Sequence, residues 1–407
     1  MGYSRRLIAT TPVDTKAGKI GLTVRLVRAE DLAAYIARWE KLASSATLPN
    51  PFFEPFMLLP AIAHLGTSSD KLRFVLVLGT ENASGEAPLL GFFPLEIRRS
   101  CMHVPVRNLA LWQHRYCYLT VPLIEAGREW QVLDAFWRWF EHNPLGCRLL
   151  DTNYLPLDAA FHDVWSDFAI GRASFAVNEH PRALLVAEGT AEDYLARMIS
   201  HKHAHEHKRL IRRLQDYGEI QYQRLTKEED VEAWISDFLR LEASGWKGTD
   251  AGDAIAKQAG NIEFVREMTR VGFKAGKVMM LAMSVGGKRI AMKYNAVSRH
   301  TAFGYKIAFD ESFAKWSPGF LLEIQHIREV FADENLRDMD SCAMPRHPMA
   351  DRIFDRRRMI RRTVFSNGSR FGDLLVSIMP MLRWGRSQVR PDAVMPYLQI
   401  STKARSA

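Results

Sequence analysis

Three strand-like runs follow one another in the C-terminal half of the chain and lead into a helix. The runs KVMMLAMSV, KRIAMKYNAV and TAFGYKIAFD occupy most of residues 277–310, and Gly286-Gly287 predicts a tight hairpin between the first two. Ser317-Pro318-Gly319 then precedes FLLEIQHIREVF, whose apolar residues recur with the period of a helix. A meander that ends in a helix predicts an α/β (α+β) fold with a mixed, largely antiparallel sheet flanked by helices.

The Ser-Pro-Gly junction has two interpretations. Serine suits the N-cap of a helix and proline suits its first turn, so the junction can simply start the helix. A helix N-terminus also presents free N–H groups and a partial positive charge, and glycine lets a ligand approach the backbone, which suits a phosphate. The junction alone leaves both interpretations open.

The order of predicted elements recurs at a domain-sized interval. Each half contains a strand, helices, a meander of strands, a further helix and a further strand, and 407 residues are enough for two domains. We therefore expect two tandem α/β units that arose by duplication. The expected boundaries are 22–178 for the first unit, 179–370 for the second and 371–407 for a C-terminal tail.

The charge of the chain favours an anionic partner. Its 55 basic and 46 acidic residues give a net charge of +9, which suits nucleic acid, a phosphorylated co-substrate or anionic lipid. The four cysteines show no C-x-x-C spacing, so we expect reduced thiols. The first residues, MGYSRRLIATTPVDTKAG, lack the apolar core of a signal peptide. Together these features predict a cytoplasmic protein.

An apolar stretch lies near the C-terminal end. FGDLLVSIMPMLRW, residues 371–384, falls short of the roughly 20 apolar residues that a membrane span needs, and Pro380 interrupts it. We interpret it as a segment packed against the protein, with peripheral contact to a membrane surface as the alternative.

Several motifs, taken in order, resemble one known family. LEASGWKG (241–248), VMMLAMSVGGKRIAMKYNAV and GYKIAFDESFAKWSPGFLLEIQHI (304–327) resemble the CelD/BcsL-like group of acetyltransferases. These are tandem GNAT-fold proteins, related in architecture to the Fem-type aminoacyltransferases. NPFFEPFMLLPA (50–61) is similar to the N-terminal signature of the group, and SHKHAHEHKRLIRRLQDYGEI (200–220) to its basic helix and following strand.

The resemblance implies a GNAT-like unit in each half, with the chemistry in the second. Acyl-CoA, acetyl-CoA above all, would be the co-substrate. Its pantetheine arm would lie along Tyr305, Lys306, Ile307 and Ala308, and its pyrophosphate beside Ser317, Gly319, Phe320 and Leu321. The usual phosphate loop is richer in glycine than KWSPGFL, and YLTVPLIEAGREW in the first half has no comparable helix start. The first half is therefore expected to be a scaffold or an acceptor wall without cofactor.

Four residues are candidates for acid–base catalysis, each with a structural alternative. Glu242 is a candidate general base or a helix-end carboxylate, and Asp310 a candidate base or a turn carboxylate. Asp340 shares one strand face with Asp338 and is a candidate catalytic or acceptor-binding group. Tyr305 is a candidate proton donor to the CoA thiolate or a packed aromatic residue.

Further residues are candidates for binding or for other chemistry. Trp246 and Lys247 follow Glu242 in the sequence and are candidates for acceptor binding. The histidines of HKHAHEH (201–207) have a spacing that can bind zinc, but we interpret them as part of a solvated basic helix and expect no metal. A covalent route through Cys342 with His347 is a further alternative.

Three functions remain open at this stage. The first is direct acyl transfer from acyl-CoA to a saccharide, glycolipid or small-molecule acceptor, with no DNA as partner. The second is a Fem-like transferase that uses aminoacyl-tRNA, whose phosphates suit the positive charge. The third is a non-catalytic regulator of polysaccharide synthesis, because the phosphate loop is poor in glycine.

Overall fold

The computed structural model describes residues 10–13, 21–82, 85–142, 145–157, 159–245, 248–249 and 254–389. Its strands are β1 (Thr10–Val13), β2 (Leu22–Val27), β3 (Leu72–Leu78), β4 (Leu89–Arg98), β5 (Asn108–Leu111), β6 (Leu123–Ile124), β7 (Leu149–Pro156), β8 (Ser174–Val186), β9 (Ile220–Arg224), β10 (Val278–Val285), β11 (Lys288–Ser298), β12 (Thr301–Phe309), β13 (Asp338–Asp340) and β14 (Arg356–Ser366). Its helices are α1 (Ile36–Ser45), α2 (Pro55–His64), α3 (Glu129–Glu141), α4 (Ala159–Ala169), α5 (Ala191–Met198), α6 (His201–Gln215), α7 (Val231–Ser244), α8 (Ala259–Lys274), α9 (Pro318–Ala332), α10 (Ala350–Ile353) and α11 (Arg370–Val389).

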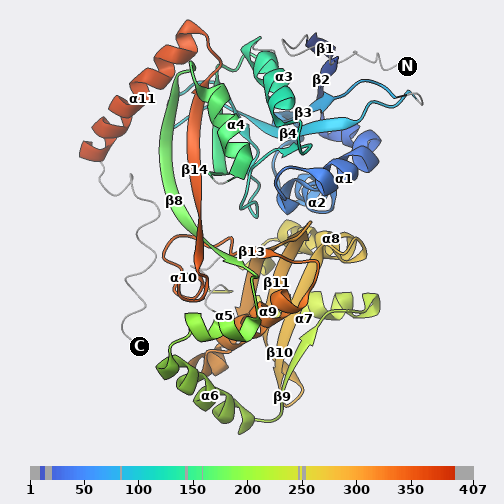
Figure 1. The fold of residues 1–407 in the computed structure, drawn as a ribbon, viewed down its shortest axis with the longest axis vertical. Coiled ribbons are helices and arrows are strands. Elements are labelled where there is room, and N and C mark those ends of the chain that lie inside the picture. Colours follow the sequence, from blue (N-terminus) through green and yellow to red (C-terminus); the bar gives the residue numbers. More distant parts are fainter. Residues whose placement is uncertain are drawn as a thin grey trace.

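One continuous sheet runs through both halves of the described chain. Its strand order is β1-β2-β3-β4-β5-β7-β14-β8-β13-β12-β11-β10-β9, and β6 pairs with β4. Neighbouring strands are antiparallel except for β5 with β7 and β12 with β13. The expected mixed, largely antiparallel sheet flanked by helices is therefore confirmed (Figure 1).

Strands β8 and β14 connect the two halves. They form a long antiparallel ribbon that runs between the upper and lower parts of the molecule (Figure 1). At one end of this ribbon β14 pairs with β7, and at the other end β8 pairs with β13. The boundary that we expected between residues 178 and 179 falls inside β8, and β14 comes from the second expected unit but pairs with a strand of the first.

Helices cover both faces of the sheet in the second half. Lys293 on β11 contacts Glu323 of α9, whereas the next residue, Tyr294, contacts Thr269 of α8. Because successive side chains of a strand point to opposite faces, α9 and α8 lie on opposite sides of the sheet. Helix α8 also contacts α2, and Phe52 packs edge-on against Phe303, so the two halves share one apolar core.

The meander of the second half forms as its sequence predicts. β10, β11 and β12 correspond to the three strand-like runs, and Gly286 and Gly287 turn the first hairpin with φ of +55° and +79°. The pattern of residues 190–218 predicts one long helical segment, but the structure divides this segment into α5 and α6. The Ser200 side chain accepts a hydrogen bond from the His203 N–H and so caps α6.

Helix α11 packs against β8 and β14, as expected for the apolar stretch near the C-terminal end. In the described part of the chain, no helix has both the length and the apolar composition needed to cross a membrane.

Candidate functional site

Strands β12 and β13 separate after a short stretch of pairing. Residues 301–303 pair in parallel with residues 338–340, after which β13 ends and β12 continues to Phe309. Gly304 lies at the point of separation, where a Cβ atom would come within 2.8 Å of the Ser341 carbonyl oxygen. From Gly304 onward, this edge of β12 has no strand partner among the described residues.

A pocket of about 210 Å³ opens at this separation. The pocket is lined by β12, by Lys293 of β11, by Glu323 of α9 and by the segment after β13. Of the residues expected along a pantetheine arm, Tyr305, Lys306 and Ile307 belong to the lining and Ala308 does not. The lining also excludes the four residues expected at a pyrophosphate, namely Ser317, Gly319, Phe320 and Leu321.

Tyr305 occupies the wall of the pocket between the two halves. Its ring contacts those of Tyr294, Tyr116 and Tyr118, with centroid distances of 5.1, 5.9 and 6.2 Å. Its hydroxyl group is buried and has no hydrogen-bond partner among the described residues. Burial, together with Tyr118 and Tyr116, raises the pKa of Tyr305 well above its usual value. The phenol therefore stays protonated at neutral pH and has a hydrogen bond to donate.

Glu242 lies near the end of α7 and is buried. Its Oε2 accepts a hydrogen bond from the Ile255 N–H at 2.7 Å, and its Oε1 lies 3.6 Å from Lys306 Nζ. Burial lowers the pKa of Lys306, although Glu242 opposes this change. Lys306 Nζ also lies 5.3 Å from the centre of the Tyr116 ring, so the second half supplies a carboxylate and an amine and the first half a phenol.

The two residues that we expected to bind the acceptor, Trp246 and Lys247, lie outside the described residues.

A buried ion pair beside the pocket was not predicted from the sequence. Lys293 Nζ lies 2.5 Å from Glu323 Oε2, and Glu323 Oε1 contacts His326 Nδ1 at 3.2 Å. Burial by itself raises the pKa of Glu323, but Lys293 and His326 lower it to about 2. The signal in the sequence was a lysine inside the apolar run IAMKYNAV and a Glu-x-x-His pair on the apolar face of the following helix.

Asp340 is fully buried and its oxygens have partners. Oδ2 lies 3.0 Å from Arg358 Nη1 of β14 and 3.8 Å from Arg182 Nη1 of β8, and Oδ1 accepts the Cys342 N–H at 2.8 Å. This arrangement neutralises the carboxylate and orients it toward the strands rather than toward an acceptor.

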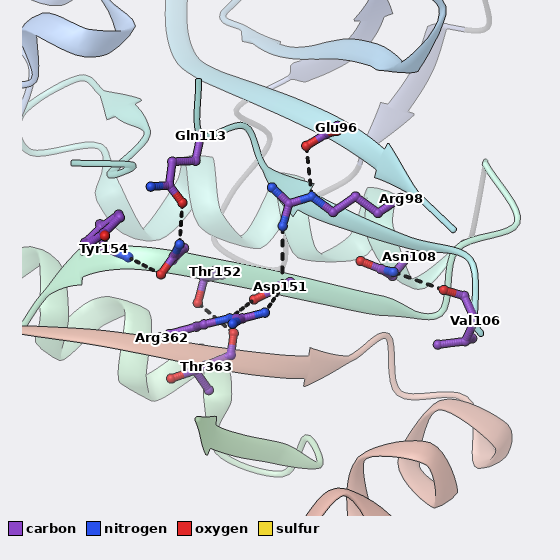
Figure 2. A network of polar contacts seen from close by, with 11 residues as sticks. Glu96, Arg98, Val106, Asn108, Gln113, Asp151, Thr152, Tyr154, Arg362 and Thr363 are labelled. Atoms are coloured by element: carbon purple, nitrogen blue, oxygen red, sulfur yellow. Dashed lines mark hydrogen bonds and ion pairs between the residues drawn. The ribbon is translucent and has the colours of Figure 1, made fainter. Parts of the chain in front are cut away.

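The first half contains a matching aspartate. Asp151 on β7 accepts hydrogen bonds of 2.9 and 2.7 Å from Arg362 of β14, and Arg98 of β4 lies 3.7 Å away (Figure 2). β5 and β7 pair only through residues 109–110 and 150–151. Beyond this point the Asn153 side chain of β7 donates a hydrogen bond to the side chain of Gln113, which follows β5. This contact lies in the first half where the pocket lies in the second half, beyond the end of the parallel pairing.

Asp310 lies away from the pocket lining, at the turn that follows β12. Its carboxylate contacts Lys288 Nζ at 2.8 Å and accepts hydrogen bonds from the N–H and the hydroxyl of Ser312. Asp310 thereby caps a short 3₁₀ helix. Burial raises its pKa, but the hydrogen bonds from Lys288 and Ser312 outweigh burial and lower it. These contacts are those of a turn carboxylate.

Cys342 lines the pocket but has the environment of an inert thiol. It is buried, and burial and Asp340 raise its pKa well above the usual value. His347, which also lines the pocket, accepts the Ala350 N–H at its Nδ1. A thiol that stays protonated is a poor nucleophile, so the geometry does not favour the covalent alternative.

The N-terminus of α9 is packed and flanked by basic side chains. A Cβ atom on Gly319 would lie 3.3 Å from the Phe309 ring and 3.6 Å from Ile307, so this glycine lets the helix approach β12 closely. Ser317 has a φ of +50° and makes no side-chain cap. The centre of the Phe320 ring lies 4.7 Å from that of the His207 ring, and the Arg352 guanidinium lies 5.8 Å from the centre of the Phe320 ring.

Comparison with known proteins identifies the domain that contains the pocket. Residues 201–345 match the family model of the acetyltransferase (GNAT) domain, and no protein with a curated description matches the chain. The fold is similar to that of a conserved protein of unknown function from Bacteroides thetaiotaomicron, with 9% identity, coverage of 88% of this chain and 100% of that chain, and a TM-score of 0.50. It is also similar to FemX, with 6% identity, coverage of 81% and 95%, and a TM-score of 0.53.

The matched segment contains β12, β13, the pocket and Tyr305. The second half of the chain therefore carries an acyltransferase domain of the GNAT type. GNAT domains use acyl-CoA as co-substrate and transfer its acyl group to an acceptor. At 9% and 6% identity, the likenesses to the two solved structures show the fold alone.

Proposed function

We propose that this protein transfers an acyl group, acetyl above all, directly from acyl-CoA to an amine or hydroxyl group of an acceptor. The observation that carries the proposal is the pocket where β12 leaves β13, with the unpartnered Tyr305 hydroxyl in its wall. The edge of β12 beyond Gly304 has no strand partner among the described residues, and this supports the function because a pantetheine arm can lie along it. Lys306, Ile307 and the adjoining Ala308 are the proposed contacts.

The phosphates of the co-substrate are proposed to lie at the N-terminus of α9. This end offers few free N–H groups, because Pro318 has none and those of Phe320 and Leu321 donate to the Ser317 carbonyl. Basic side chains compensate for the missing donors. Arg352, whose guanidinium lies 5.8 Å from the centre of the Phe320 ring, supplies positive charge, and His207 beside the same ring can donate a ring N–H.

Glu242 and Tyr305 are proposed as the base and the acid. The acceptor nucleophile attacks the thioester carbonyl carbon, and Glu242 takes its proton. The carbon–sulfur bond then breaks, and the Tyr305 hydroxyl gives its proton to the departing thiolate. Glu242 then releases its proton to solvent and the phenolate takes one from solvent, so the products are the acylated acceptor and free CoA. Asp340 and Asp310 are assigned supporting roles in the sheet and in the turn.

The acceptor is proposed to approach from the α7 side of the sheet. Glu242 and Lys306 lie on that side, whereas the Lys293–Glu323 pair faces α9. Tyr116 and Tyr118 of the first half contact Tyr305, which supports a role of that half as an acceptor wall. The resemblance to the CelD/BcsL-like group supports a saccharide, glycolipid or small molecule as acceptor. Trp246 and Lys247 are proposed to contribute to this site.

A Fem-like transfer from aminoacyl-tRNA is the second candidate. The fold likeness to FemX, which extends over 95% of that chain, and the net charge of +9 favour it. Retention of tRNA in a gel, weakened steeply by salt, together with no response to CoA, would select this candidate.

A pocket-filling variant tests the first candidate. Ala343 lines the pocket, whereas the next residue, Met344, is exposed and does not. We expect acetyl-CoA to raise the melting temperature of the wild-type protein and of Met344→Trp, but not that of Ala343→Trp. Equal shifts in both variants, or no shift in the wild-type protein, would count against acyl-CoA binding at this position.

A further inference from the structure

Helix α11 has two apolar faces. Leu375, Val376 and Met379 are buried against the sheet beside Cys101. The opposite side presents large apolar residues to solvent, which are 42–72% exposed: Phe371, Leu374, Met381, Leu382 and Trp384. Spacings of three, seven, ten and eleven residues from Phe371 or Leu374 keep these side chains on one side of the helix. The helix lies at the outer edge of the molecule, beside the ribbon of β8 and β14 (Figure 1).

A basic groove adjoins this helix. It has a volume of about 920 Å³, and its lining contains the basic residues Lys71, Arg73, Arg98, Arg99 and Arg107 but only two acidic residues, Asp70 and Glu96. The loop that bears Arg99 and Arg107 packs against α11 through Cys101 and Val106. Arg148 adds a further positive charge, 5.5 Å from the centre of the Phe371 ring.

We propose that the exposed face of α11 and the basic groove dock this protein on a membrane surface that contains anionic phospholipids. The apolar side chains enter the boundary between head groups and acyl chains, and the arginines pair with lipid phosphates. A second copy of this chain is a less suitable occupant, because a symmetric contact would bring two positively charged grooves together. RNA is also less suitable, because it would bind the groove and leave the apolar face of α11 exposed. Docking does not depend on the proposed acyl transfer.

Vesicle binding tests this proposal with the full chain. Large vesicles of phosphatidylcholine, with or without phosphatidylglycerol, are sedimented with the protein at low and high salt. We expect binding only to the anionic vesicles and weaker binding at high salt. Met381→Ser with Trp384→Ser should weaken binding about tenfold. Arg99→Gln with Arg107→Gln should weaken it at least as much, because each arginine near an anionic surface contributes about fivefold.

The control is Val271→Ser, which removes an exposed apolar side chain from α8 of the other half and should leave binding unchanged. Unaltered melting temperatures of all variants exclude unfolding as the cause. Three results of the vesicle and light-scattering measurements would overturn the proposal, and a fourth comes from tRNA retention. The first three are no binding by the wild-type protein, equal binding by all variants, and a dimer in light scattering that the α11 variant abolishes. Loss of tRNA retention in the arginine variant, with vesicle binding intact, would assign the groove to RNA and equally overturn it.

Discussion

Asp151 and Asp340 occupy equivalent positions in the two halves of the sheet. Each stands at the last residue pair of a parallel strand pairing, opposite Ala110 and Phe303 respectively. Each is held by an arginine of β14, Asp151 by Arg362 and Asp340 by Arg358. A single strand therefore fixes both halves through buried ion pairs, and in the second half a pocket opens beyond the aspartate.

The first prediction concerns the role of Asp340. Asp340→Asn removes the carboxylate charge that Arg358 and Arg182 contact, and we expect a loss of about 3–5 kcal/mol in the free energy of unfolding. Urea denaturation measures this loss. Asp151→Asn, which removes the charge that Arg362 contacts in the first half, should destabilise the protein in the same direction. A full catalytic defect in Asp340→Asn without loss of stability would show instead that Asp340 acts on the substrate.

The second prediction separates the Tyr305 hydroxyl from its ring. Tyr305→Phe should lower kcat about 10²-fold, because it removes the proposed proton donor, and should preserve stability, because the hydroxyl has no partner among the described residues. CoA-thiol release with a panel of amino sugars, sugars and amino acids as acceptors measures the rate. In the matched control, Tyr294→Phe, the hydroxyl that contacts Thr269 is lost, so stability should fall and kcat should not. A Tyr305→Phe enzyme of normal rate would refute the assignment.

The third prediction concerns the proposed base. Glu242→Gln should lower kcat about 10²-fold and leave protection by acetyl-CoA intact, because Glu242 lies on the acceptor side. Glu232→Gln serves as control, since Glu232 is on the same helix but is exposed and pairs with Arg270. Equal rates in the two variants, measured by thiol release, would remove Glu242 from the mechanism.

The fourth prediction is a dependence of stability on pH that arises from Glu323. Its pKa is about 2 in the folded protein and its ordinary value is 4.5, because Lys293 and His326 outweigh the effect of burial. The unfolded state therefore binds a proton at higher pH than the folded state does. The contribution of the pair is complete above pH 4.5 and is lost as the pH falls toward 2. Between pH 7 and pH 3 this group should cost about 2 kcal/mol of unfolding free energy.

Glu323→Gln isolates this contribution. The variant should lose stability at pH 7, because Lys293 is left buried without its partner, and its further loss between pH 7 and pH 3 should be smaller than in the wild-type protein. The double variant Lys293→Met with Glu323→Gln should recover part of the stability at pH 7. Identical pH dependence of the wild-type protein and Glu323→Gln would mean that other carboxylates carry the effect.

Local pattern predicted much of the second half. The three strands, the glycine hairpin and the helix after Ser317-Pro318 are set by residues close in the sequence, through alternation, turn geometry and helical period. The approximate order of elements in both halves follows for the same reason. The break between α5 and α6 was missed because a serine inside a helical pattern does not reveal whether it caps a new helix.

Contacts between distant residues decided the remainder. Whether Asp340 faces a cleft or two arginines depends on β8 and β14, and the alternation of its own strand carries no information about them. The same holds for Glu323, whose partner Lys293 lies 30 residues earlier, and for Tyr305, whose wall is built by tyrosines of the other half. The sequence by itself determined which elements form, because helices and strands depend on neighbouring residues. Only the tertiary structure decided which charges are neutralised and which gap stays open, because burial and pairing depend on how the chain brings remote segments together.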